Sequence, residues 1–308
     1  MWQSYTQGRK LKAEYVENLK FLSANYSLNE VYVRSSDTTR TLVSAYSNMA
    51  GFYSASEGTH PDENEWPNKW TPIPVHTVEQ KDDNVIWSFS NCPRLHQLMK
   101  EQFQYEGYVN AVKKNKDLYD VVQANAHVNI SDFGPLVTFA NTLLIEKLHN
   151  MTFPEWITDD IYRRTKEMYE IGFDYFLGGA AFGREENVEL VSLSGGVLMT
   201  EMIENMLKRT RGERTPLYHV YSGHDATVAG LLRTVGAKEA ILGSTPADYA
   251  SVVVVELWQI PLKGYAVRLR YSANAESPLV TFCSLGTFIQ NREKYAMRNV
   301  SQACIAKK

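Results

Sequence analysis

Residues 217–225, LYHVYSGHD, decide the fold of this chain, because an apolar run passes at once into small and polar residues. Residues 217–221 have the length and composition of a buried strand, and residues 226–235, ended by Gly236, have the apolar content of a helix. His224 and Asp225 therefore follow a strand and precede a helix. This position presents both side chains at the rim of a sheet, where free helix N–H groups attract anions in open α/β folds.

A second strand-to-helix junction lies near the start of the chain. Residues 30–35 alternate like a short strand, and the helix that follows ends at Gly51. Asp37 is the predicted N-cap of that helix, and Arg40 falls three residues later. A cation in the first turn of a helix costs about 0.3 to 1 kcal/mol unless an anion offsets it.

Each of these residues also has a purely structural interpretation. Arg40 could be exposed or paired with a surface carboxylate, Asp225 could only cap its helix, and His224 could be a hydrogen-bonded turn residue. The two junctions alone leave these alternatives open.

The remaining segments predict an α/β fold, with a mixed, mainly parallel sheet flanked by helices. Residues 251–259 and 265–271 have the patterns of strands, whereas residues 94–183 are largely helical. We therefore predict one α/β domain formed by residues 1–92 and 191–308. A smaller α-helical subdomain, residues 93–190, is inserted into it.

The composition excludes several classes of function. A net charge of −3 over 308 residues gives no positive field that would gather nucleic acid or anionic lipid. No run of about 18 apolar residues suits a membrane span, and residues 1–20 lack the apolar segment of a secretory signal. Metal-binding, nucleotide-binding and serine-hydrolase motifs are absent, so we expect neither a metal nor a cofactor.

Two features nevertheless bear on export. Four glycosylation sequons begin at Asn25, Asn129, Asn150 and Asn299. Three cysteines, Cys92, Cys283 and Cys304, allow at most one disulfide within the chain.

Several motifs resemble those of one known family. Residues 31–41, VYVRSSDTTRT, and residues 221–227, YSGHDAT, are similar to two motifs of the histidine acid phosphatases, in branch 2 of the histidine phosphatase superfamily. Residues 70–78, 91–94 and 195–198 resemble further segments, in the family's order. The resemblance covers nearly the whole chain. It implies the phosphoglycerate mutase-like fold of that family and hydrolysis of phosphate monoesters through a phosphohistidine.

The resemblance also implies a role for each junction residue. Arg40 corresponds to an arginine that clamps phosphate, His224 to a histidine that contacts phosphate, and Asp225 to the general acid that protonates the leaving alcohol. The family's nucleophile is the histidine of an Arg-His-Gly-X-Arg-X-Pro segment on the first, central strand, and that segment is absent from this sequence. We therefore expect the first central strand, the nucleophile and two further arginines to be missing.

Such a site should bind phosphate weakly and hydrolyse it barely. Loss of a nucleophile removes around six powers of ten in turnover, and a phosphate dianion would be held only by Arg40 and a protonated His224. Three hypotheses follow: an incomplete copy of a secreted acid phosphatase, which we favour; a noncatalytic protein that binds phosphate esters; and a nonfunctional product. The expected partner is a small phosphate monoester or inorganic phosphate, and homodimers are common in the family.

Two further expectations rest on the resemblance. The family places a disulfide where this chain has Cys92 and Cys304, which leaves Cys283 without a partner. Its prostatic and lysosomal members imply a secreted or lysosomal location.

Overall fold

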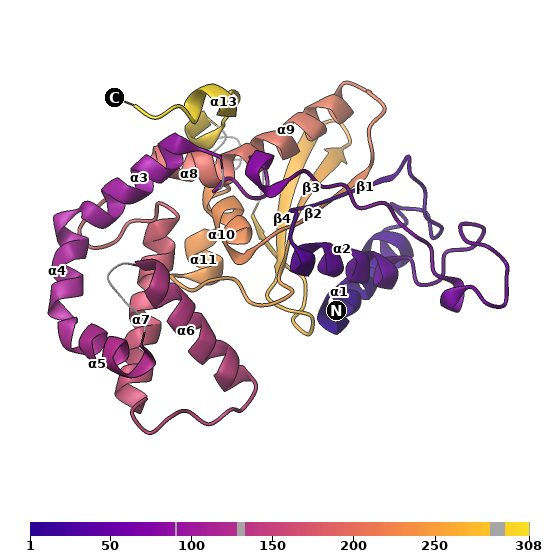
Figure 1. Ribbon diagram of the computed structural model, residues 1–308. Coiled ribbons are helices and arrows are strands. Elements are labelled where there is room, and N and C mark those ends of the chain that lie inside the picture. Colours follow the sequence, from indigo (N-terminus) through magenta and orange to yellow (C-terminus); the bar gives the residue numbers. More distant parts are fainter. Residues whose placement is uncertain (90, 128–132, 284–292, 308) are drawn as a thin grey trace.

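The computed structural model describes residues 1–89, 91–127, 133–283 and 293–307 (Figure 1). The strands are β1 (Val31–Ser35), β2 (Tyr218–Ser222), β3 (Val252–Ile260), β4 (Gly264–Ser272) and β5 (Val280–Cys283). The helices are α1 (Trp2–Lys12), α2 (Thr39–Phe52), α3 (Pro93–Gln104), α4 (Glu106–Lys114), α5 (Lys116–Ala126), α6 (Phe133–Leu148), α7 (Asp159–Phe176), α8 (Val188–Val191), α9 (Val197–Thr210), α10 (Asp225–Thr234), α11 (Lys238–Leu242) and α13 (Val300–Ala303). Two π-helical segments, Ala13–Asn18 and Ser192–Gly196, continue α1 and precede α9.

The described strands form two sheets. β1 and β2 pair in parallel, from Val31 opposite Tyr218 to Ser35 opposite Ser222. β3, β4 and β5 pair in antiparallel order, and the β3–β4 hairpin extends from Val252 opposite Ser272 to its turn. The predicted α/β fold with mixed strand pairing is therefore confirmed, and the antiparallel part is longer than the parallel pair.

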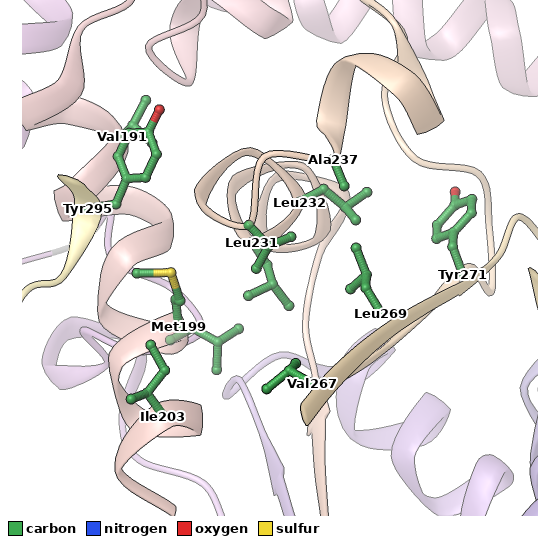
Figure 2. Packing of buried hydrophobic residues seen from close by; sticks show 12 residues of the cluster. Val191, Met199, Ile203, Leu231, Leu232, Ala237, Val267, Leu269, Tyr271 and Tyr295 are labelled. Carbon is green, nitrogen blue, oxygen red and sulfur yellow. The ribbon is translucent and has the colours of Figure 1, made fainter. Parts of the chain in front are cut away.

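Helices cover the strands from two sides. On one side, Leu11 of α1 and Met49 of α2 pack with Val31 and Val33 of β1. On the other side, α9 and α10 pack against β4. Figure 2 shows this second core, in which the labelled side chains turn toward a common centre; they include Met199, Ile203, Leu231, Leu232, Val267 and Leu269. The strands thus form a layer between two apolar cores.

Glycines allow α1 and α2 to approach closely. A Cβ atom on Gly8 would lie 1.9 Å from the carbonyl oxygen of Asn48, and one on Gly51 would lie 2.1 Å from that of Tyr5. Any side chain at either position would therefore force the two helices apart. This contact fixes α2, whose first turn carries Arg40.

The described residues from α3 to α7 are largely helical, as predicted. In Figure 1 these helices lie to the left of the strands, whereas α1 and α2 lie to the right. The proposed subdomain boundaries at residues 93 and 190 stay a prediction. Among the described residues, no helix is long and apolar enough to cross a membrane.

The structure contains the disulfide between Cys92 and Cys304 that the resemblance implied. It ties the start of α3 to the end of α13 across 212 residues of sequence. Asn25, Asn150 and Asn299 are exposed, whereas Asn129 and the side chain of Cys283 lie outside the described residues.

Candidate active site

The parallel pairing of β1 and β2 brings the two strand-to-helix junctions together. The backbone N–H of Ser36 donates to the carbonyl oxygen of Ser222 at 3.1 Å, and the Ser222 hydroxyl donates to the carbonyl oxygen of Thr41 at 2.8 Å. Beyond these bonds α2 and α10 begin side by side. Arg40 of α2 consequently contacts His224, with 3.0 Å between a guanidinium nitrogen and Nδ1.

This contact fixes the tautomer of His224. A guanidinium can only donate, so Nδ1 must accept, and the proton of the neutral ring lies on Nε2. That N–H donates to the hydroxyl oxygen of Ser36 at 2.8 Å. The Ser36 hydroxyl in turn lies 2.9 Å from Oγ1 of Thr41, whose own hydroxyl donates to backbone carbonyls. Each donor in this buried chain therefore has an acceptor.

His224 is held neutral. Burial and, to a smaller extent, the positive charge of Arg40 lower its pKa to about 4, against a smaller opposite effect of Asp83. The expectation of a protonated His224 concerns the ring facing a phosphate dianion, and it stays a prediction. The sequence shows the position of the histidine but not its loss of solvent.

Asp225 occupies the first position of α10, and its pKa is shifted upward, opposite to that of His224. Burial raises its pKa, and a hydrogen bond from the Ala226 backbone and the charge of Arg40 partly counteract this. The carboxyl is enclosed by protein on several sides but has solvent-accessible surface facing a cavity. A carboxyl with a raised pKa that remains accessible is suited to donate a proton.

A loop between α2 and α3 completes the surroundings of His224. The ring of Trp87 meets the imidazole edge to face, with 4.5 Å between ring centroids. Asp83 holds this loop, because its buried carboxylate accepts from the backbone of Val85 and Ile86 and from Arg34 of β1 at 2.9 Å. The His224 rotamer is thus fixed by Arg40, Ser36 and Trp87 together.

Arg40, His224 and Asp225 all line a cavity of about 2060 Å³. Helices α6 and α7 reach the same cavity through Asn141 and Tyr169, which are hydrogen-bonded to each other at 3.1 Å. Burial raises the pKa of Tyr169, and the charge of Asp225 adds to the shift. The Tyr169 hydroxyl therefore stays protonated beside the site.

The structure brings together the three residues that the sequence singled out, but it corrects one detail. Asp37 does not cap α2, since the helix begins at Thr39 and Thr38 is the N-cap. Sequence reasoning missed Ser36, Trp87 and Tyr169. Trp87 lies in an irregular, proline-rich stretch without periodicity, so no local pattern could have indicated it.

The site offers no metal-binding cluster. Within the described ranges, no group of three His, Cys, Asp or Glu side chains is arranged to hold an ion. What the site does present is one guanidinium, one neutral imidazole and one carboxyl with a raised pKa.

Known relatives share both sequence and fold with this chain. Prostatic acid phosphatase from Rattus norvegicus is 30% identical over 263 residues, which cover 84% of this chain and 65% of the rat protein. The chain thus spans about two thirds of that relative's length. Lysosomal acid phosphatase from Homo sapiens is 28% identical, over 99% of this chain and 70% of the human protein.

Solved structures give the same result for the fold. The phytase from Citrobacter braakii matches 99% of this chain and 88% of its own, with a TM-score of 0.64 at 12% identity. The apo form of the Hafnia alvei phytase matches with a TM-score of 0.62. Finally, the family model of the histidine phosphatase superfamily (branch 2) matches residues 1–272, and the chain belongs to that family.

Proposed function

We propose that this site binds the phosphoryl group of a small phosphate monoester, or inorganic phosphate, and that Asp225 is the acid for the leaving oxygen. The observation that carries the proposal is the contact of Arg40 with His224 beside Asp225 in one cavity. Family membership and the named acid phosphatase relatives agree with it.

Each residue has a distinct part in this proposal. The planar guanidinium of Arg40 matches the geometry of two phosphate oxygens and neutralises their charge. When the anion binds, Nδ1 of His224 takes up a proton and donates to a third oxygen. Asp225 gives its proton to the ester oxygen as the bond from phosphorus to that oxygen breaks, so that an alcohol leaves rather than an alkoxide. Its raised pKa keeps more of the acid form available in mildly acidic solution.

Residues 1–308 contain no Arg-His-Gly sequence, and His224 is not placed to attack phosphorus. Its Nδ1 lone pair accepts from Arg40, and its Nε2 carries the proton bonded to Ser36. We therefore propose that residues 1–308 alone bind phosphate but hydrolyse its esters barely. In a complete form that contains the nucleophile, hydrolysis would proceed through a phosphohistidine. The alternative, a noncatalytic protein that binds phosphate esters, is favoured by the same missing nucleophile.

One pair of measurements tests the proposal. Titration with inorganic phosphate or vanadate should give saturable binding in the millimolar range, and Arg40→Gln should weaken it about tenfold or more. Arg298→Gln removes the same charge from an exposed residue that does not line the cavity and should have no effect. Flat titrations would overturn the binding role. Hydrolysis of p-nitrophenyl phosphate near the ~10 s⁻¹ typical of enzymes would overturn the claim that the nucleophile is missing.

We also propose that this chain is a secreted or lysosomal glycoprotein, because the relatives are prostatic and lysosomal proteins. The exposed sequons at Asn25, Asn150 and Asn299 support this setting. Material from a secreting cell should lose mass after glycosidase treatment. Unchanged mass would contradict glycosylation.

A further inference from the structure

A basic run precedes β2, at the opposite end of this strand from His224 and Asp225. Residues 208–214, KRTRGER, contain four cations and a single carboxylate. They form the end of α9 and the start of the connection from α9 to β2. The phosphate chemistry proposed above uses none of these residues, so their role is a separate question.

The helix accounts for two of these cations but not for the other two. Lys208 and Arg209 lie in the last turn of α9, where cations stabilise the negative end of the helix dipole. Arg211 and Arg214 lie beyond the helix. Arg211 pairs with Glu213 at 2.7 Å, but both side chains are about half exposed, so this pair contributes little to stability. Among the residues that the structure describes, Arg214 has no ion pair.

Arg211 and Arg214 frame an exposed segment without regular structure. All four residues from Arg211 to Arg214 are exposed, and residues 213–217 belong to no helix or strand. The chain turns at Gly212, which has a φ of 77° and open space where a Cβ atom would lie. In Figure 1 this connection forms a bend beyond the end of α9. Exposed bends of this kind are preferred sites of proteolytic cleavage.

Little structure has to open before this segment can become extended. The last turn of α9 is closed by a backbone hydrogen bond from Glu213 to Lys208 at 3.1 Å. Helix ends open at low free-energy cost, and Gly212 can take an extended φ without strain. Farther along, the backbone N–H of Leu217 donates to Glu30 at 2.8 Å and holds the start of β2. A protease can therefore bind the segment in extended form while β2 stays paired.

The spacing of the two arginines gives the segment its specificity. Arg211 and Arg214 are separated by two residues, and the pattern Arg-X-X-Arg occurs once in residues 1–308. A guanidinium binds a carboxylate through two parallel hydrogen bonds, which lysine cannot reproduce. A protease with two acidic pockets at this spacing would therefore select this segment over the other basic positions of the chain.

We propose that the peptide bond between Arg214 and Thr215 is a processing site. The protease is a secretory-pathway endoprotease of the subtilisin-like convertase class, which requires arginine directly before the cut bond and at the fourth position before it. Water adds across the peptide bond and leaves a carboxylate on Arg214 and an amino group on Thr215. This inference rests on the secreted or lysosomal location proposed above, and it does not depend on phosphate binding.

Cleavage at this bond gives two chains that stay together. The disulfide of Cys92 with Cys304 joins the part of the chain before the cut to the part after it. The parallel pairing of β1 with β2 joins them a second time and keeps Arg40 beside His224. The cut protein should therefore bind sulfate as well as the uncut protein does.

The test incubates the purified, unreduced whole chain with a recombinant subtilisin-like convertase. Electrophoresis with reductant should show two fragments, and N-terminal sequencing of the smaller fragment should begin at Thr215. Without reductant, the cut protein should migrate as a single species of full mass, because the disulfide holds the two parts. Sulfate titration of the cut protein should give unchanged affinity.

Two variants separate recognition of both arginines from simple exposure. Arg211→Gln should slow cutting by the convertase about tenfold or more, because one acidic pocket of the protease loses its charged partner. Trypsin requires only the arginine directly before the bond, so it should cut this variant after Arg214 as fast as the unaltered chain. Arg209→Gln is the matched control, since it removes a neighbouring exposed cation and should leave both rates unchanged.

The outcomes distinguish the site from the location. No cut before Thr215 in the unaltered chain, or equal cutting of Arg211→Gln by the convertase, would overturn the site. A chain from secreting cells that carries glycans but resists the purified convertase would overturn the site and leave the location standing. A chain that the convertase cuts, but that carries no glycans when secreting cells make it, would overturn the location and with it the proposed processing.

Discussion

The guanidinium of Arg40 donates to Nδ1 of His224 across 3.0 Å; this contact sets the tautomer of the imidazole and adds to the effect of burial, which keeps the ring neutral. An imidazolium carries a proton on each nitrogen and could not accept this bond. Protonation of His224 must therefore separate the two side chains. A dianion bound between them would instead favour protonation of His224, because it accepts hydrogen bonds from both the guanidinium and the imidazolium.

Binding of a divalent oxyanion is therefore expected to take up protons. The pKa of His224 is about 4 in the protein without an anion, and a nearby dianion raises it. Affinity should rise as the pH falls from 7 to 5, by at most about tenfold per pH unit for one proton. Sulfate is the suitable probe, since it stays a dianion over this range. Calorimetry in buffers of different ionisation enthalpy measures the uptake directly.

The control for this prediction is His224→Asn, whose side-chain amide can still accept a hydrogen bond from Arg40 and donate one to Ser36. Its sulfate affinity should depend much less on pH, with the remaining dependence coming from Asp225. Equal pH profiles for the variant and the unaltered chain would contradict the linkage.

The same shift makes the fold sensitive to acid. A histidine whose folded pKa lies at about 4, below its ordinary 6.5, contributes stability that is present above pH 6.5 and is lost as the pH falls toward 4. The loss is on the order of 2 to 3 kcal/mol for a buried ring. Urea unfolding at pH 7 and pH 4.5 should show a smaller loss for His224→Asn than for the unaltered chain. A steeper loss in the variant would rule out this role of His224.

Ser36 is expected to stabilise the buried Nε2–H of His224. Ser36→Ala leaves this N–H without its acceptor, which should cost about 1 to 3 kcal/mol of stability in urea unfolding. Nitrogen NMR of the imidazole should still show a single tautomer, because Arg40 still donates to Nδ1. Ser35→Ala removes an equally buried hydroxyl that donates to the Ser36 carbonyl, and it should cost less because it leaves no buried donor without an acceptor. A mixture of tautomers in Ser36→Ala would contradict the role of Arg40.

The sequence predicted the two junctions because each depends on local patterns: a short apolar strand, small residues and an amphipathic helix. It predicted that Arg40 and His224 share a site only through the family motifs, since these two residues lie 184 positions apart and meet only because β1 and β2 pair in parallel. Burial was not readable from the pattern, so the neutral state of His224 was missed. The contacts of Trp87 depend on the path of an irregular loop, which no periodicity encodes.

Asp225 should oppose anion binding whenever it is ionised. Asp225→Asn removes a negative charge from the site and should tighten sulfate binding at pH 7 by about five- to tenfold. Burial raises the pKa of Asp225, so lowering the pH protonates the carboxyl and should shrink this difference. Sulfate titrations of both proteins at pH 7 and pH 5 provide the measurement. A difference that grows toward pH 5 would contradict the direction of the shift.

The ion pair of Arg34 with Asp83 is expected to hold the loop that carries Trp87. The Asp83 side chain is fully buried, and Arg34 lies 2.9 Å away. Arg34→Met would leave a buried carboxylate without its cation, which costs about 3 to 5 kcal/mol in comparable pairs. Urea unfolding measures this loss of stability. Sulfate affinity should also fall, because Trp87 would no longer hold the His224 ring in place.

Arg163→Met is the matched control, because Arg163 also bridges acidic residues but is more than half exposed. Exposed pairs contribute about 0 to 1 kcal/mol. If both variants lost the same free energy of unfolding, the hydrogen bonds from the Val85 and Ile86 amides alone would have to stabilise the buried charge of Asp83. The loop would then hold Trp87 against His224 through its backbone rather than through the charge of Arg34.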